Sequence, residues 1–154
     1  MEAKVSWQKD LDFVGVADSG YEVKVASHSG PGAGVGPMEM VAIAIAGCTA
    51  MDVISILQKK QQKVTSFDVK VHADRAADHP KVFTNAVVEY VVVGHDVDEA
   101  AVLRAVELSV TKYCSVQAMV SKAFPIEKRY SIYEDEGSGK QRLVKQGTLQ
   151  HDGH

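Results

Sequence analysis

One apolar stretch determines how this sequence is organised: residues 37–53 read PMEMVAIAIAGCTAMDV. A proline suits the first turn of a helix, because its φ is fixed and its missing N–H needs no partner there. No further proline occurs before Lys63, and the residues from Met40 to Leu57 are apolar on nearly every side. A helix that is apolar on every face is buried on every face. Residues 37–63 are therefore predicted to form a central helix packed against another helix or a partner subunit.

Short strands are predicted before this helix. Residues 3–26 contain three short alternating segments, and residues 18–20, Asp-Ser-Gly, are typical of a hairpin turn. Residues 27–36 hold four glycines and one proline, which favour a loop. We expect an antiparallel meander that leads through a loop into the helix.

Strand patterning returns after the helix. Residues 65–94 alternate or run apolar as strands do, and residues 126–133 predict a last strand. Between them, residues 97–124 show a helical stripe with Asp96 as the expected N-cap of a capping box. Weak helix formers around Cys114 predict a kink or break in this second helical region.

The composition fits one domain of the α+β class. A chain of 154 residues buries enough surface to be stable without a disulfide or a metal. Residues 1–135 are predicted to form the domain, and the polar residues 136–154 a C-terminal extension of uncertain order. The net charge of −3, without a dense Lys/Arg cluster, argues against nucleic acid as a partner.

The subcellular localisation is predicted from the first residues of the sequence. They lack the apolar segment and cleavage site of a secretory signal, which favours the cytoplasm. The longest uninterrupted apolar run, residues 40–47, is shorter than the roughly 20 residues that a bilayer-spanning helix needs. No membrane association is therefore predicted.

The two cysteines of the chain, Cys48 and Cys114, are the candidate chemical groups. Their separation of 114 − 48 = 66 residues is too large for a C-x-x-C pair or a zinc knuckle. If the fold brings them together, they form a reversible dithiol and disulfide pair; otherwise they are small buried hydrophobes. The histidines show no metal-ligand spacing, so no metal is predicted, and no cofactor either.

The surroundings of these cysteines resemble a known family. The segment from Pro37 through an alanine-rich helix to Gly47-Cys48, followed far downstream by Tyr113-Cys114, is similar to the OsmC/Ohr family. This family comprises osmotically inducible proteins and organic hydroperoxide resistance proteins of the stress response. The similarity covers about residues 4–133 in order and spacing.

The resemblance implies an OsmC-like fold, with two central helices packed on antiparallel sheets in an intertwined homodimer. It also implies a thiol peroxidase, in which Cys48 is oxidised by a hydrophobic organic hydroperoxide and Cys114 resolves the sulfenic acid as a disulfide. A dithiol or lipoyl-type reductant would then restore the thiols. Taken alone, the predicted position of Cys114 at a helix start favours it as the more acidic thiol.

Two features of the family pattern are missing. No arginine occurs before Arg75, and Met38 instead of a glutamate follows Pro37. These departures predict a divergent branch and keep three alternatives open: a noncatalytic small-molecule-binding protein, a redox sensor and a structural dimer.

Four further residues are possible supporting groups. Glu39 fits a first-turn anion of the helix better than a catalytic group, and Asp52 lies one turn after Cys48. Asp52 either raises the pKa of a nearby thiol or makes a buried polar contact across a dimer, and the second interpretation is favoured. Met38 and Met51 either line an apolar pocket or fill gaps in a helix interface.

Overall fold

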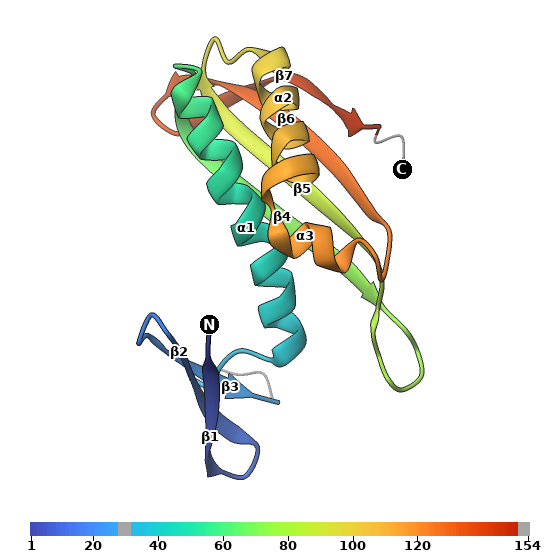
Figure 1. Cartoon of the computed structure of the whole chain (residues 1–154). Helices are drawn as coiled ribbons and strands as arrows, with labels where there is room; N and C mark the ends of the chain where they lie inside the picture. The colour runs from blue at the N-terminus through green and yellow to red at the C-terminus, as the bar shows by residue number, and fades with distance from the viewer. Residues whose placement is uncertain (28–31, 151–154) are drawn as a thin grey trace. The chain divides into compact units, whose positions relative to one another are not determined.

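The computed structural model describes residues 1–27 and 32–150, so part of the predicted loop 27–36 lies outside the described residues. The chain divides into two compact units, Met1–Ile43 and Ala44–His154. Both consist of antiparallel or mixed sheet with few helices (Figure 1). The predicted α+β class is confirmed.

The first unit contains a three-stranded antiparallel sheet. Its strands are β1 (Ala3–Lys9), β2 (Asp12–Ala17) and β3 (Glu22–Ala26), in the order β1-β2-β3. The turn between β2 and β3 closes with a 2.9 Å hydrogen bond from the Gly20 amide to the Ala17 carbonyl. Gly20 has a φ of 80°, which glycine adopts without steric cost.

The long helix α1 (Pro37–Lys59) begins at the predicted proline but ends four residues before the predicted Lys63. Gln61 adopts a φ of 56° and turns the chain directly into the next strand. One face of α1 is buried within the chain, through Ile45, Thr49, Val53 and Leu57. The opposite side is open, since Met51 is 69% exposed. The expectation that every face is buried is therefore wrong for the single chain.

Helix α1 is also long and apolar enough, by length and composition, to cross a bilayer. Counting only the uninterrupted run at residues 40–47 missed this, because Thr49 and Asp52 interrupt the apolar sequence without making the whole helix polar. A core helix passes the same test, and the buried face of α1 contacts its own chain. The cytoplasmic localisation and the lack of membrane association remain predictions.

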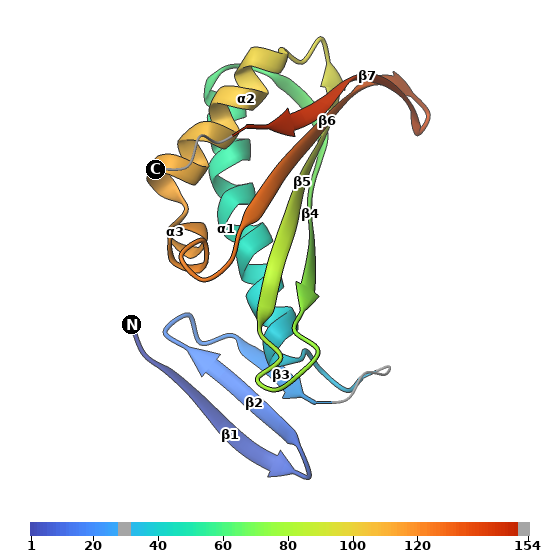
Figure 2. The same cartoon turned by 90° about the vertical axis from the view of Figure 1, so that its right-hand side faces the viewer.

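The second unit is built on a four-stranded sheet. Its strands are β4 (Lys63–Arg75), β5 (Phe83–His95), β6 (Ile126–Gly137) and β7 (Lys140–Leu149), in the order β4-β5-β6-β7. Helices cover one face of this sheet (Figure 2). The central strand β5 places Val88, Tyr90 and Val92 in the core, each fully buried.

The strand pairing departs from a purely antiparallel sheet. β4 with β5 and β6 with β7 are antiparallel, but β5 with β6 is parallel. The reason is the connection, because the chain crosses over through the helical region between these two strands. At the start of that crossover, a Cβ on Gly94 would lie 2.2 Å from the Lys63 carbonyl oxygen, so only glycine fits there.

The crossover contains α2 (Glu99–Leu108), the π-helical turn η1 (Ser109–Tyr113) and α3 (Ser115–Val120). The structure therefore breaks the helix next to Cys114, where the sequence indicated a break. The N-cap of α2 is Asp98, whose carboxylate accepts a 3.1 Å hydrogen bond from the Ala100 amide. Naming Asp96 as the cap was wrong. Asp96 instead has a φ of 47° and donates its amide to Glu134.

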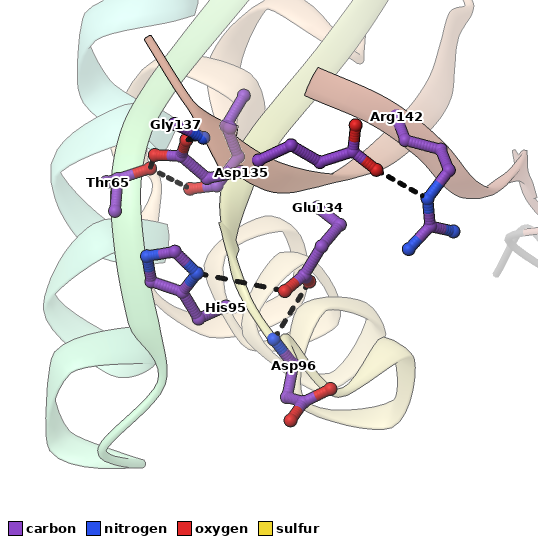
Figure 3. A network of polar contacts seen from close by, with 9 residues as sticks. Thr65, His95, Asp96, Glu134, Asp135, Gly137 and Arg142 are labelled. Carbon is purple, nitrogen blue, oxygen red and sulfur yellow. Dashed lines mark hydrogen bonds and ion pairs between the residues drawn. The ribbon is translucent and has the colours of Figure 1, made fainter. Parts of the chain in front are cut away.

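Residues 140–149 continue the sheet as β7 and pair with β6 from Lys128 to Gly137. The polar sequence hid this strand, because β7 is largely exposed and lacks an apolar face. Side chains at the end of the sheet connect β6 with β4 and with the end of β5 (Figure 3). Thr65 donates a 2.7 Å hydrogen bond to Asp135, and the Glu134 carboxylate lies 3.7 Å from His95.

Candidate thiol site

The fold brings the two cysteines together in the second unit. Cys48 lies in the middle of α1, and Cys114 lies between η1 and α3. Their sulfur atoms and a carboxylate oxygen of Asp52 all lie within 4.8 Å of one another. Both cysteines are free thiols; Cys48 is half-buried, and Cys114 is 2% exposed. The arrangement offers two adjacent sulfurs, the more accessible of them on a long helix.

Local backbone structure places Cys114 at this position. The π-helical turn ends with a 2.7 Å hydrogen bond from the Cys114 amide to the Ser109 carbonyl. Cys114 then adopts an extended conformation and becomes the N-cap of α3. Its sulfur accepts a 3.4 Å hydrogen bond from the Gln117 amide, as a capping side chain does.

This environment makes Cys114 a weak acid. Burial raises its pKa to about 12, and the hydrogen bond with Cys48 acts in the same direction. The Gln117 amide lowers the pKa, but by less than burial raises it. The expectation that Cys114 is the more acidic thiol was therefore wrong. Its helix-start position was right, but α3 has only six residues and the sulfur is almost entirely shielded from water.

A chain of buried hydroxyl groups extends from Asp52 into the core. The Ser109 hydroxyl donates a 2.9 Å hydrogen bond to Asp52 and lies 2.8 Å from the Thr49 hydroxyl. Thr49 in turn lies 2.9 Å from the hydroxyl of Tyr90. The Gln117 amide group donates a longer, 3.4 Å hydrogen bond to the same Tyr90 oxygen. Four residues from α1, β5, η1 and α3 are thus linked by hydrogen bonds beside the thiols.

Sequence reasoning did not select Thr49, Tyr90, Ser109 or Gln117 as site residues. A signal was present, because each is a polar residue within an apolar helical stripe or strand. Buried polar groups require partners, so such positions predict one another. The sequence does not indicate which of these residues pair, because the partners lie up to 60 residues apart.

The predicted supporting residues fall in different places. Asp52 is at the site and bonds to Ser109 within its own chain, whereas the sequence favoured a contact across a dimer. The Glu39 carboxylate accepts a 2.7 Å hydrogen bond from the Gly36 amide, the backbone role of a first-turn residue. Met38 is half-buried in that same first turn of α1, and Met51 is exposed.

A surface hollow of about 500 Å³ adjoins the site and includes the Asp52 side chain. Met51, Leu108 and Tyr113 form an apolar part of its wall, and Lys59 and Lys60 are the cations that line it. The hollow is large enough for a small organic molecule. Asp52, whose carboxylate lies beside both sulfurs, is one of its lining residues.

The same three residues, Cys48, Cys114 and Asp52, also form a potential metal-ligand set. Two thiols and one carboxylate within 4.8 Å can converge on a soft divalent ion such as Zn²⁺. The prediction of no metal was based on the spacing of the histidines, and that spacing says nothing about a set of two cysteines and an aspartate. The prediction remains untested.

Comparison with known proteins identifies relatives that cover most of the chain. The OsmC-like protein family matches residues 30–128. Protein YhfA of Escherichia coli K12 is 43% identical over 132 residues, which cover 86% of this chain and 98% of YhfA. A crystal structure of a hypothetical protein from Aquifex aeolicus VF5 is 30% identical, with a TM-score of 0.79, covering 88% of this chain and 97% of that one.

A more distant structure has the same fold. It is an organic hydroperoxide resistance protein OsmC, described as a predicted redox protein, from Legionella pneumophila. It is 13% identical, with a TM-score of 0.61, and the alignment covers 85% of this chain and 94% of that one. Together with the cysteine pair, the family match and the YhfA relationship show that this chain belongs to the OsmC-like protein family.

Proposed function

We propose that this protein is a thiol-dependent peroxidase that reduces organic hydroperoxides through Cys48, with Cys114 as the resolving thiol. The observation that carries the proposal is the proximity of the two sulfur atoms. They belong to residues 66 positions apart in the sequence and lie within 4.8 Å of each other. The Legionella relative is named for organic hydroperoxide resistance, which agrees with this chemistry.

The difference between the two thiols assigns their roles. Cys48 is the more accessible, and Cys114 retains its proton because its pKa is raised to about 12. A protonated Cys114 donates a hydrogen bond to a Cys48 thiolate and stabilises the nucleophile. The Cys114 thiol would then provide part of the thiolate stabilisation that the arginine of the OsmC/Ohr family pattern would otherwise supply. Among residues 1–27 and 32–150, no arginine forms a hydrogen bond or ion pair with Cys48, Cys114 or Asp52.

The reaction proceeds in three balanced steps. The Cys48 thiolate attacks the outer peroxide oxygen, the O–O bond breaks, and the alkoxide leaves with a proton as an alcohol, so that Cys48 becomes a sulfenic acid. The Cys114 sulfur then attacks the Cys48 sulfur, forming a disulfide and releasing water. An external dithiol, a lipoyl group for example, reduces this disulfide and becomes a cyclic disulfide itself.

The hollow beside Asp52 supports a hydrophobic substrate. Its apolar wall at Met51, Leu108 and Tyr113 suits the organic group of a hydroperoxide, whereas hydrogen peroxide gains nothing from it. Asp52 lies where it can take up the proton of the Cys48 thiol before attack. Ser109 holds the carboxylate in position through its 2.9 Å hydrogen bond.

A homodimer is part of the same proposal. Helix α1 leaves Ile43 and Met51 exposed to 61% and 69% in the single chain, although most of the helix is apolar. Large exposed apolar side chains on a helix are a common feature of subunit interfaces. A second copy that covers this side of α1 accounts for its apolar composition.

Peroxidase activity is tested with cumene hydroperoxide and dihydrolipoamide, comparing the wild-type protein with Cys48→Ser and Cys114→Ser. Turnover is expected in the wild type only. Cys114→Ser should consume one equivalent of peroxide and retain a dimedone-reactive sulfenic acid, whereas Cys48→Ser should consume none. Wild-type turnover no faster than that of Cys48→Ser contradicts the proposal. Rapid disulfide formation without turnover in that assay would instead favour a redox sensor.

A further inference from the structure

A buried lysine lies outside the thiol site. Lys128 lies in β6, and Tyr130 and Ile132, which share its face of the strand, are buried as well. Lys128 itself is only 8% exposed. This is an unusual position for an ammonium group, because charged side chains are seldom this buried unless they are paired.

Lys128 has no partner among residues 1–27 and 32–150. Its ammonium group makes no hydrogen bond or ion pair with any of these described residues. Burial lowers its pKa, and no carboxylate offsets that effect. Glu99, the partner of Tyr130, is already engaged, because it accepts from Tyr130 and lies 3.8 Å from Lys145. A buried ammonium without a counter-ion is unfavourable, which leaves a place for an external anion.

Lys128 lines a cavity of about 510 Å³ between α2 and the β6–β7 hairpin. Leu103, Val106, Val110 and Leu149 provide its apolar walls. Arg104 and Glu107 also line the cavity. They form an ion pair at 2.8 Å, so their two charges offset each other. The cavity therefore combines an apolar volume of ligand size with one uncompensated positive charge.

Gly147 and Glu99 hold one wall of this cavity in place. Gly147 pairs with Tyr130 across the β6–β7 ladder, and a Cβ on Gly147 would lie 2.8 Å from the Tyr130 hydroxyl oxygen. The absence of that side chain leaves room for the Tyr130 ring, whose hydroxyl donates to Glu99. The hydroxyl of Tyr130 therefore bonds to Glu99 and not to Lys128.

We infer that this cavity binds an amphipathic monocarboxylate, with its carboxylate paired to Lys128 and its aliphatic or aryl body against the α2 side chains. An anion satisfies the ammonium, and the apolar walls match a hydrocarbon body of moderate length. The site is separate from Cys48 and Cys114 in its lining residues, so ligand binding here does not depend on the proposed peroxidase reaction.

Decanoate is the probe that tests this inference, with 1-decanol as its uncharged counterpart. Isothermal titration should show saturable binding of decanoate at one site per chain, and at least about tenfold weaker binding of decanol. Lys128→Met should weaken decanoate binding by at least about tenfold, because it keeps the length of the side chain but removes its charge. Lys128→Arg should stay within a few-fold of the wild type.

Lys122→Met is the matched control, because Lys122 is exposed and lies outside the cavity lining. It should bind decanoate as the wild type does. Chemical shift changes should concentrate on the methyl groups of Leu103, Val106 and Leu149. Three results would each overturn the inference: equal affinity for decanol and decanoate, unchanged binding in Lys128→Met, or no saturable binding of decanoate. Unfolding curves of both variants establish that they are folded.

Discussion

Cys48 lies beside Cys114 and raises the pKa of the Cys114 thiol, in addition to the larger effect of burial. The two thiols of this dithiol centre are therefore not equivalent. Cys48 is half-buried, whereas Cys114 is buried and its pKa is raised to about 12.

Alkylation should distinguish these thiols. With a pKa of about 12, only on the order of 10⁻⁴ of Cys114 is thiolate near pH 8, against roughly a quarter of an ordinary thiol. Iodoacetamide at pH 8 should modify Cys48 much faster than Cys114, as peptide mass spectrometry would measure. Cys114 should remain slow in Cys48→Ser, because burial is the largest cause of its raised pKa. Equal labelling rates would contradict the assigned roles.

Removing the Ser109 hydroxyl should destabilise the protein. Ser109→Ala deletes the hydrogen bonds to Thr49 and Asp52 in a fully buried position. The free energy of unfolding should fall by about 1–3 kcal/mol, because a buried hydroxyl and a partly buried carboxylate lose a partner. Urea denaturation measures this change. Ser66→Ala, at an exposed position of β4, is the control and should stay within about 0.5 kcal/mol of the wild type.

Tyr90 should make stability depend on pH in the alkaline range. Burial raises its pKa above 10, so its contribution to stability is complete below pH 10 and is lost as the pH rises towards its folded pKa. Stability should decline less steeply above pH 10 in Tyr90→Phe than in the wild type, by up to about 1.4 kcal/mol per pH unit. Tyr21→Phe, at an 83% exposed position, should leave the slope unchanged.

Zinc should compete with oxidation at the thiol site. The reduced protein offers two sulfurs and the Asp52 carboxylate within 4.8 Å, so Zn²⁺ should slow alkylation of Cys48 and release protons on binding. Competition with a chromogenic chelator measures its affinity. Asp52→Asn should weaken binding by at least about tenfold, and the disulfide form is the control that should not bind. Equal zinc affinity of the reduced and disulfide forms would contradict this ligand set.

The proposed dimer should respond to a charge on α1. Met51→Lys places an ammonium on a side chain that is 69% exposed in the single chain, so the fold should tolerate it. Sedimentation analysis should show the variant shifted from dimer to monomer. Val82→Lys, at a 52% exposed position before β5, is the control and should sediment as the wild type does. A dimer of unchanged stability in Met51→Lys would place the interface elsewhere.

Much of the fold could be read from the sequence because its signals are local. Pro37 marked the start of α1, and the weak helix formers around Cys114 indicated a break where η1 and α3 meet. Strand β7 gave no such signal, because it has no apolar face and depends on hydrogen bonds to β6. The N-cap of α2 was misassigned because Asp96 and Asp98 are equally good caps by residue type.

The site was only partly predictable. Cys48, Cys114 and Asp52 were selected from the sequence, and they do lie together. The acidity of Cys114 was misjudged because burial is a property of the folded chain, not of a helix start. The hydroxyl chain through Thr49, Ser109 and Tyr90 depends on contacts between distant elements, which no local pattern specifies.

The π-helical turn gives Ser109 two simultaneous attachments. Its carbonyl holds the backbone of Cys114, and its hydroxyl holds Asp52 and Thr49. Any displacement of Cys114 towards Cys48 on disulfide formation therefore pulls on a residue that is anchored in the core. The redox state of two sulfur atoms is mechanically connected to the packing around Tyr90, and it should be detectable there as altered amide hydrogen exchange.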